Sequence, residues 1–300
     1  MNDRIRGTIE MASSMAIAGT IGWVVVQSDQ PVTTLVFWRC LFGAMALFVV
    51  CTALGVFRGH LTARVLLSSA LGGAAIVANW LLLFASFPRA SISIATAVYS
   101  TQPFILVGFG ALVLGERITG TALAWLALAF AGVVAIIGAR PSADYAGSGY
   151  LLGIAFAFGA AIFYAVAAVF AKKLQGTPPH LVALIQVCVG VLMLAPFIRI
   201  SDLPVDADAW KGLLALGVVY TALMFTLQYG AIQRLPTSLT GSLYFIYPAV
   251  AIVVDVVAFG HVLRGAEMAG IAAILLGAAG MTLGWRFRAA KRPCVVEEAP

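Results

Sequence analysis

Charged residues are scarce in this sequence of 300 residues: Asp, Glu, Lys and Arg make up 10% of the chain, whereas 62% of the residues are hydrophobic. The mean hydropathy is +1.03. Soluble globular domains carry about 25% charged residues, so this composition excludes them. Because a spanning helix needs roughly 20 predominantly apolar residues, the sequence predicts an all-α membrane protein.

Histidine and cysteine are also rare, with three and four residues. The cysteines have no paired spacing for zinc or redox chemistry, and we expect no disulfides. The histidines form no H-E-x-x-H motif and have no nearby partner set that suggests catalysis. We therefore expect no enzyme, no cofactor and no metal, and an intramembrane hydrolase or acyltransferase is the weakest alternative.

Apolar stretches follow one another along the chain with short loops, the longest of about ten residues. The first stretch follows Arg4 and Arg6 without a clear cleavage site, so it is predicted to be a retained helix and not a signal peptide. No loop leaves room for a soluble domain. The ten predicted transmembrane helices cover residues 7–26, 32–54, 66–87, 91–114, 119–138, 149–171, 180–199, 210–230, 236–259 and 265–285.

The net charge of +6 comes from basic residues at the ends of these helices. With the N-terminus inside, twelve Lys and Arg residues fall in inner segments and five in outer segments. Cytoplasmic loops carry such an excess, so we expect both termini and the loop at Lys172 and Lys173 to be cytoplasmic. The inner residues are Arg4, Arg6, Arg58, Arg64, Arg117, Lys172, Lys173, Arg234, Arg286, Arg288, Lys291 and Arg292.

The chain repeats itself at an offset of 145 residues, which aligns residues 79–138 with 224–283. The most distinctive match is Tyr-x-x-x-Pro followed twelve residues later by Gly, in Tyr99, Pro103 and Gly115 and again in Tyr244, Pro248 and Gly260. Five helices per half is an odd number, so the second half must enter the membrane inverted. Inverted repeats commonly build secondary transporters, and a duplication that only makes a stable bundle is the alternative. The predicted units are a first five-helix repeat at 1–140, a second, inverted one at 141–288 and a cytoplasmic tail at 289–300.

These features resemble the drug/metabolite transporter superfamily and its EamA-type carriers, with paired five-helix repeats, Gly115-Glu116-Arg117 at the end of the fourth helix and a proline-broken ninth helix. The resemblance runs from about Gly7 to Trp285 and is nearest to the aromatic amino-acid exporter branch. It implies a secondary transporter or facilitator that exports small organic metabolites, above all aromatic and neutral amino acids, by alternating access. A channel, or a carrier for a nucleobase, a sugar phosphate or a drug, is the alternative.

Pro103 and Pro248 fall about halfway along the fourth and ninth helices, where each removes the hydrogen bond to the carbonyl of Tyr99 or Tyr244. A carbonyl freed near the midplane must be satisfied by protein, water or ligand, and a substrate amino group is a natural partner. A packed kink relieved by a nearby Ser or Thr is the alternative. We expect both tyrosines to line a central site.

Other polar and aromatic residues complete the predicted site. An amide such as Asn79 is costly in hydrocarbon unless it faces a partner or a wet cavity, and an interhelical hydrogen bond is its alternative role. The predicted substrate-binding residues are Tyr99, Tyr244, Asn79, Trp80, Gln102, Tyr247, Tyr164 and Phe163.

The ionisable residues Arg39 and Asp255 lie at comparable depths below the outer surface. They are candidates for an ion pair, and the alternative is that Arg39 snorkels to the surface.

The expected setting is the bacterial inner membrane. As partners we expect a small-molecule substrate and the lipid bilayer, no nucleic acid, and a monomeric protein.

Overall fold

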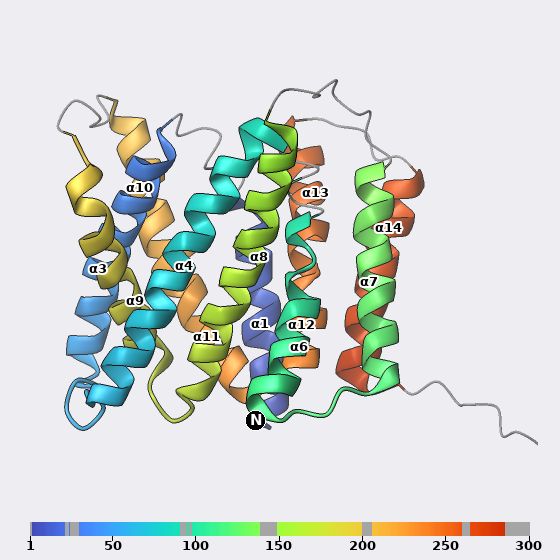
Figure 1. Ribbon diagram of the computed structural model, residues 1–300, viewed down its shortest axis with the longest axis horizontal. Coiled ribbons are helices and arrows are strands. Elements are labelled where there is room, and N and C mark those ends of the chain that lie inside the picture. The colour runs from blue at the N-terminus through green and yellow to red at the C-terminus, as the bar shows by residue number, and fades with distance from the viewer. Residues whose placement is uncertain are drawn as a thin grey trace, which may run out of the picture.

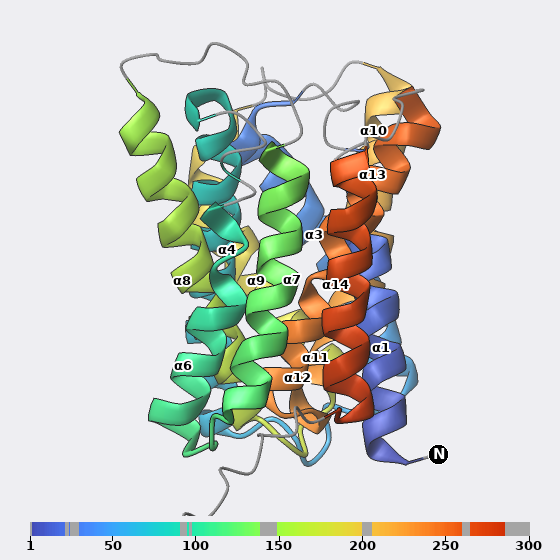
Figure 2. The ribbon, with the colours of Figure 1, turned by 90° about the vertical axis from the view of Figure 1, so that its right-hand side faces the viewer.

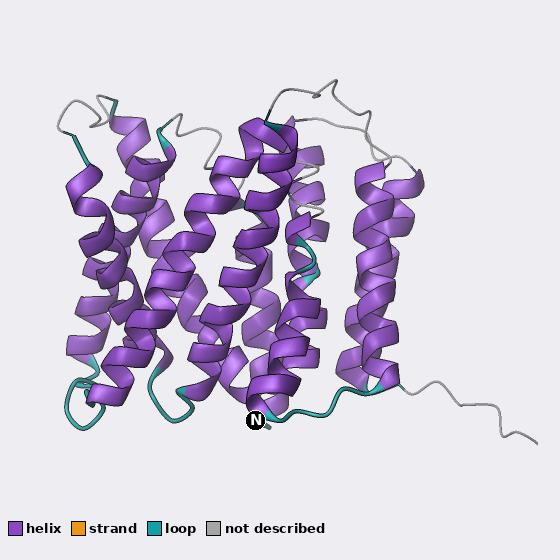
Figure 3. Cartoon of the chain, in the orientation of Figure 1, coloured by secondary structure: helices purple, strands orange, loops and turns teal. Residues whose placement is uncertain are grey.

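In a computed structural model the chain is helical (Figure 3), and the described residues, 2–21, 24, 30–90, 95, 98–138, 149–199, 206–259 and 265–285, contain no strand. The predicted all-α class is therefore confirmed. The elements are α1 (Asp3–Gly19), α3 (Val32–Ala53), α4 (Ala63–Ala90), α6 (Gln102–Leu114), α7 (Gly120–Gly138), α8 (Tyr150–Lys173), α9 (Pro179–Leu194), α10 (Ala207–Gly217), the π-helical segment Val218–Leu223, α11 (Met224–Arg234), α12 (Thr237–Tyr244), α13 (Ile246–Phe259) and α14 (Gly265–Leu283).

Within the described residues, five helical segments are long and apolar enough to cross a membrane: Val32–Ala53, Ala63–Ser86, Tyr150–Lys173, Pro179–Phe197 and Ala207–Arg234. Large apolar side chains on the outside of the bundle are widely exposed, among them Leu112, Leu151, Leu192 and Val257. In water such a surface would drive aggregation, whereas lipid tails solvate it at no cost. The exposed surface therefore supports the predicted membrane protein.

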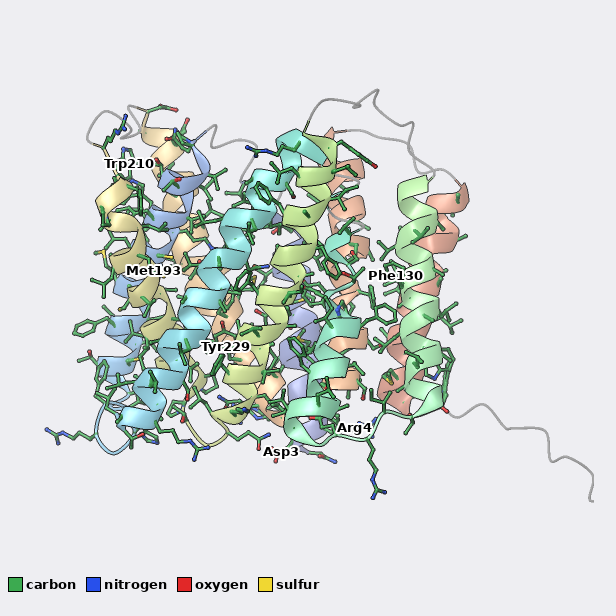
Figure 4. All side chains as sticks on the ribbon, viewed as in Figure 1. Asp3, Arg4, Phe130, Met193, Trp210 and Tyr229 are labelled. Atoms are coloured by element: carbon green, nitrogen blue, oxygen red, sulfur yellow. The ribbon has the colours of Figure 1, made fainter. Side chains whose placement is uncertain are left out.

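The helices stand side by side, and the longer ones, such as α4 and α8, run from one end of the bundle to the other (Figures 1 and 2). The N-terminus and the turns that join α3 to α4, α6 to α7 and α8 to α9 lie at one common end (Figure 1). Asp3 and Arg4 are at that end, while Trp210, in the first turn of α10, is near the other (Figure 4). The described basic residues that were predicted to be cytoplasmic therefore share one end of the bundle.

The internal repeat of the sequence is also present in the helix boundaries. The helices α7 and α14 begin 145 residues apart and end 145 residues apart. The same offset takes α6 close to α13, and α4 to the segment that runs from α10 to α11. The two halves therefore fold into the same succession of helices, as the duplicated pattern predicts.

Glycines let the repeat-related helices α7 and α14 approach closely. A Cβ atom at Gly132 of α7 would lie 2.6 Å from the carbonyl oxygen of Gly270, and one at Gly277 of α14 would lie 2.9 Å from that of Trp125. Helices in membranes associate through such small residues because packing, not water, drives their contact. Gly132 and Gly277 are themselves 145 residues apart, so each half contributes the same kind of contact.

We expect Gly132→Ala and Gly277→Ala to lower the free energy of unfolding by about 1–3 kcal/mol each, because the added methyl group meets backbone that cannot move aside. The measurement is thermal unfolding of the purified protein in detergent. Gly120→Ala is the matched control on α7, since a Cβ atom there has no atom within 4 Å. Equal effects at Gly120 and Gly132 would contradict the close α7–α14 packing.

Candidate functional site

Two helices of the bundle begin directly after a tyrosine and a short interruption. The helix α6 begins at Gln102, after a turn at Ser100 and Thr101, while α12 ends at Tyr244 and α13 begins after a turn at Phe245. Pro103 and Pro248 are thus in the first turns of α6 and α13, where a missing N–H leaves no helical hydrogen bond unmade. The interruption in each half falls just before the proline, not at it, and Ser100 and Phe245 are equivalent positions of the repeat.

Four tyrosines gather where these interruptions meet. Tyr99 and Tyr244 lie close enough for their hydroxyl groups to interact. The ring of Tyr244 lies 5.3 Å from that of Tyr164 on α8 and 6.1 Å from that of Tyr247 on α13, measured between centroids. These separations are typical of favourable aromatic pairs. We call these four residues the tyrosine cluster, and they come from both halves of the chain.

Two buried amides hold the tyrosine cluster in place. Asn79 of α4 donates through Nδ2 to the hydroxyl of Tyr99, at 3.1 Å, and to the carbonyl of Ala160 on α8, at 2.7 Å. Gln228 of α11 donates to the hydroxyl of Tyr164 at 2.9 Å. The interhelical bond that was the alternative role of Asn79 is therefore present. A contact between Asn79 and a substrate stays a prediction.

A third amide, Gln102, is buried without a partner among the described residues. Its side chain has 0% exposed area, and neither Nε2 nor Oε1 is hydrogen-bonded to a described residue. The Oε1 atom of Gln228 is also buried and has no hydrogen-bond partner among the described residues. A buried polar atom left unpaired costs about 1–3 kcal/mol. These atoms therefore have unused hydrogen-bonding capacity for water or a solute in the part of the bundle that carries the tyrosine cluster.

Trp80, the neighbour of Asn79 on α4, packs against a buried cation. The guanidinium carbon of Arg39 lies 4.1 Å from the centroid of the Trp80 ring. Arg39 is 1% exposed, so it does not snorkel to the surface. The side chain of Asp255 lies outside the described residues, and the proposed ion pair stays a prediction.

Phe163 is placed apart from the tyrosine cluster. Its ring is 40% exposed, whereas the adjacent Tyr164 is buried among the other tyrosines. Successive residues of an α-helix point about 100° apart, because one turn takes 3.6 residues. Two consecutive residues of a helix therefore rarely share a face. The sequence alone did not show whether Phe163 or Tyr164 faces the interior.

Sequence reasoning missed a polar contact at the end of the bundle where the N-terminus lies. The Oε2 atom of Glu116 accepts hydrogen bonds from the backbone N–H and the hydroxyl of Thr237, at 2.9 and 2.8 Å, and its Oε1 atom lies 3.6 Å from Nζ of Lys172. This carboxylate joins the ends of α6 and α8 to the start of α12. A carboxylate at a helix N-terminus is favoured by the helix dipole, but the sequence gives no sign of which helix Glu116 would reach.

The chemistry available in the tyrosine cluster is that of binding. It offers aromatic rings, hydroxyl groups and amides, with the guanidinium of Arg39 beyond Trp80. In the described part of the chain no group of three His, Cys, Asp or Glu residues could hold a metal ion. Stacking and neutral hydrogen bonds of this kind suit an organic solute that carries both an apolar and a polar part.

Proteins of similar sequence align with most of the chain. The uncharacterized transporter YxxF of Bacillus subtilis (strain 168) is 29% identical over 276 residues, which cover 90% of this chain and 88% of the relative. A probable amino-acid metabolite efflux pump of Salmonella typhimurium is 29% identical over 213 residues, or 66% and 70% of the two chains. The aromatic amino acid exporter YddG of Ancylobacter novellus is 28% identical over 185 residues, or 60% and 63%.

A solved crystal structure superimposes with a TM-score of 0.80, covering 92% of this chain and 96% of the other at 22% identity, which shows a shared fold. The family description "EamA-like transporter family" matches the chain twice, at residues 8–138 and 151–283. The two matches coincide with the two halves of the repeat. The chain therefore belongs to the EamA-like transporter family, within the drug/metabolite transporter superfamily.

Proposed function

We propose that this transporter is a carrier that exports small organic metabolites, above all aromatic and neutral amino acids, from the cytoplasm by alternating access. The observation that carries the proposal is the tyrosine cluster, in which residues from both halves meet beside two interrupted helices. In transporters built from inverted repeats the substrate site lies at such an interface, and interrupted helices supply free backbone groups to it.

The groups in the cluster favour this class of substrate. The rings of Tyr99, Tyr164, Tyr244 and Tyr247 suit an aromatic side chain, which binds by offset or edge-to-face contact. The unpaired amide atoms of Gln102 and Gln228 offer hydrogen bonds to the polar end of the solute. The names of two relatives, a probable amino-acid metabolite efflux pump and an aromatic amino acid exporter, point to the same class.

Transport by purified protein in liposomes tests the proposal directly. A panel of radiolabelled amino acids, nucleobases and sugar phosphates separates the solute classes, and we expect aromatic and neutral amino acids to be taken up. Saturable counterflow distinguishes a carrier from a channel, because only a carrier exchanges one bound solute for another. Uptake of sugar phosphates or nucleobases alone would overturn the proposed substrate class.

We further propose that ten segments cross the bacterial inner membrane, in two inverted five-helix repeats at 1–140 and 141–288, with 289–300 as a cytoplasmic tail. Five of the segments qualify by length and composition. The others are α1, the segment that carries Tyr99 and α6, α7, the pair α12 and α13, and α14. Each half then holds five crossings, and the second half is inverted relative to the first.

Reporter fusions test this topology. Alkaline phosphatase fused at Gln175, in the turn between α8 and α9, should be inactive, because that turn lies at the end where the basic residues gather. The same enzyme fused at Gly149, before α8, should be active in the periplasm, and a fluorescent protein should show the opposite pattern. An active fusion at Gln175 would refute the proposed orientation.

We expect Tyr99→Phe and Tyr244→Phe to raise the KM for a transported aromatic amino acid roughly 2- to 10-fold, which is the loss of one neutral hydrogen bond. Transport kinetics in proteoliposomes measure the change. Tyr229→Phe is the matched control, because Tyr229 is a buried tyrosine whose hydroxyl donates to the amide oxygen of Gln186, outside the tyrosine cluster. It should reduce stability without changing the KM, and equal KM values in all three variants would count against the site.

A further inference from the structure

A single arginine, Arg39, is buried along α3 in the interior of the bundle, with 1% of its surface exposed. Arginine keeps its proton in proteins, so burial cannot be relieved by neutralisation as it could for lysine. An ionisable residue in the middle of a membrane protein is expensive and is a functional-site hypothesis by default. The neighbours of Arg39 therefore decide what it does.

The described neighbours of Arg39 are all neutral. Its Nε donates to Oγ1 of Thr221 at 2.8 Å, and its Nη2 donates to the carbonyl of Tyr220 at 2.9 Å. The rings of Trp80 and Phe225 lie 4.1 and 5.8 Å from the guanidinium carbon. Among the described residues no carboxylate forms an ion pair with it. The positive charge is thus solvated by dipoles and rings without a counter-ion from this part of the chain.

The predicted partner, Asp255, is on a helix with other neighbours. The helix α13 packs against α1 and α14, whereas α3 packs against α9, α10 and the π-helical segment. The helix that carries Asp255 is therefore not among the main packing partners of α3. A carboxylate that arrives with the solute would supply an anion for Arg39.

The π-helical segment Val218–Leu223 is what orients the guanidinium. The hydroxyl of Thr221 donates its one hydrogen to the carbonyl of Leu216, at 2.7 Å, so it can only accept from Arg39. Close approach of α3 is possible because Gly43, one turn after Arg39, contacts the Thr221 side chain, where a Cβ atom would lie 2.8 Å from Cγ2. Single-turn π segments of this kind occur frequently at functional sites. The fixed pose presents a planar cation, the group that binds carboxylates in two-point fashion.

Arg39 is linked to the tyrosine cluster through two neighbouring residues of α4. Trp80 covers the guanidinium of Arg39. The next residue toward the N-terminus, Asn79, donates a hydrogen bond to the hydroxyl of Tyr99. Arg39 and Tyr99 are close enough to interact electrostatically. A solute with an aromatic ring in the cluster and a carboxylate toward α3 would therefore meet a matching group at each end, once Trp80 moves aside.

We propose that Arg39 binds the carboxylate of the transported solute, so that the carrier requires a free carboxylate. This inference rests on the proposed function and adds to it a residue that selects among solutes. An amide or ester of the same amino acid keeps the ring and the ammonium group but offers no negative charge to Arg39. Such compounds should be rejected.

The test compares phenylalanine with phenylalaninamide as competitors of uptake into proteoliposomes. The unmodified protein should bind phenylalanine roughly 30-fold or more tightly than the amide, the size expected for a buried charged pair. The Arg39→Gln variant should bind phenylalanine only as tightly as it binds phenylalaninamide. Its affinity for phenylalaninamide should equal that of the unmodified protein. Arg64→Gln, which removes an exposed cation from the first turn of α4, is the matched control and should change neither.

Arg39→Lys is the second variant, for use if the Arg39→Gln protein does not insert into the membrane. It retains the charge but not the planar fork, so phenylalanine should bind about tenfold more weakly and still be preferred over the amide. Loss of affinity for both compounds by the same factor, in either variant, would show that Arg39 only supports the fold and would overturn the inference. A carrier that transports both compounds equally well contradicts this inference alone, whereas one that transports neither contradicts the proposed substrate class and the inference with it.

Discussion

A polar side chain inside a membrane bundle has no water to bond to, and this constraint governs the interior of the protein. Each buried amide must find its partner on a neighbouring helix or leave an atom unpaired. A buried Ser or Thr hydroxyl can also bond to the backbone of its own helix, as Thr240 does to the carbonyl of Pro236. Asn79 bonds from α4 to α8, Gln228 from α11 to α8, and Arg39 from α3 to the π-helical segment. The few polar residues of an apolar chain thus fix how the helices are arranged around the tyrosine cluster.

The same constraint connects this packing to transport. A polar group that bonds to a neighbouring helix in one conformation can bond to the substrate in another. The free-energy cost of this exchange is small, because one hydrogen bond replaces another. In the proposed site, the atoms of Gln102 and Gln228 that lack a described partner are available to a solute without the loss of an existing hydrogen bond. The Glu116 contact with Thr237 and Lys172 lies at the end of the bundle where the N-terminus lies, and it ties α6 of the first half to α12 of the second.

Much of this architecture could be predicted from the sequence, and the residues show why. The repeat of Tyr99 and Pro103 in Tyr244 and Pro248 indicated interruptions at equivalent points of the two halves, although each interruption falls just before the proline, which lies in the first turn of the next helix. The meeting of Tyr99 and Tyr244 follows from the pseudo-symmetry of the halves. The neutral surroundings of Arg39 could not be foreseen, because they depend on a π-helical segment 182 residues further along the chain.

The sequence by itself determined the helical class, the duplication and the membrane setting, because a bilayer demands long apolar runs and a duplicated motif shows in the residues themselves. The tertiary structure alone decided which face of each helix turns inward and which helices become neighbours. The reason is that lipid and protein interior are both apolar, so a membrane helix carries little amphipathic signal to show its buried side. Phe163 and Tyr164 are adjacent in the chain, yet only packing placed one ring on the exposed surface and the other in the tyrosine cluster.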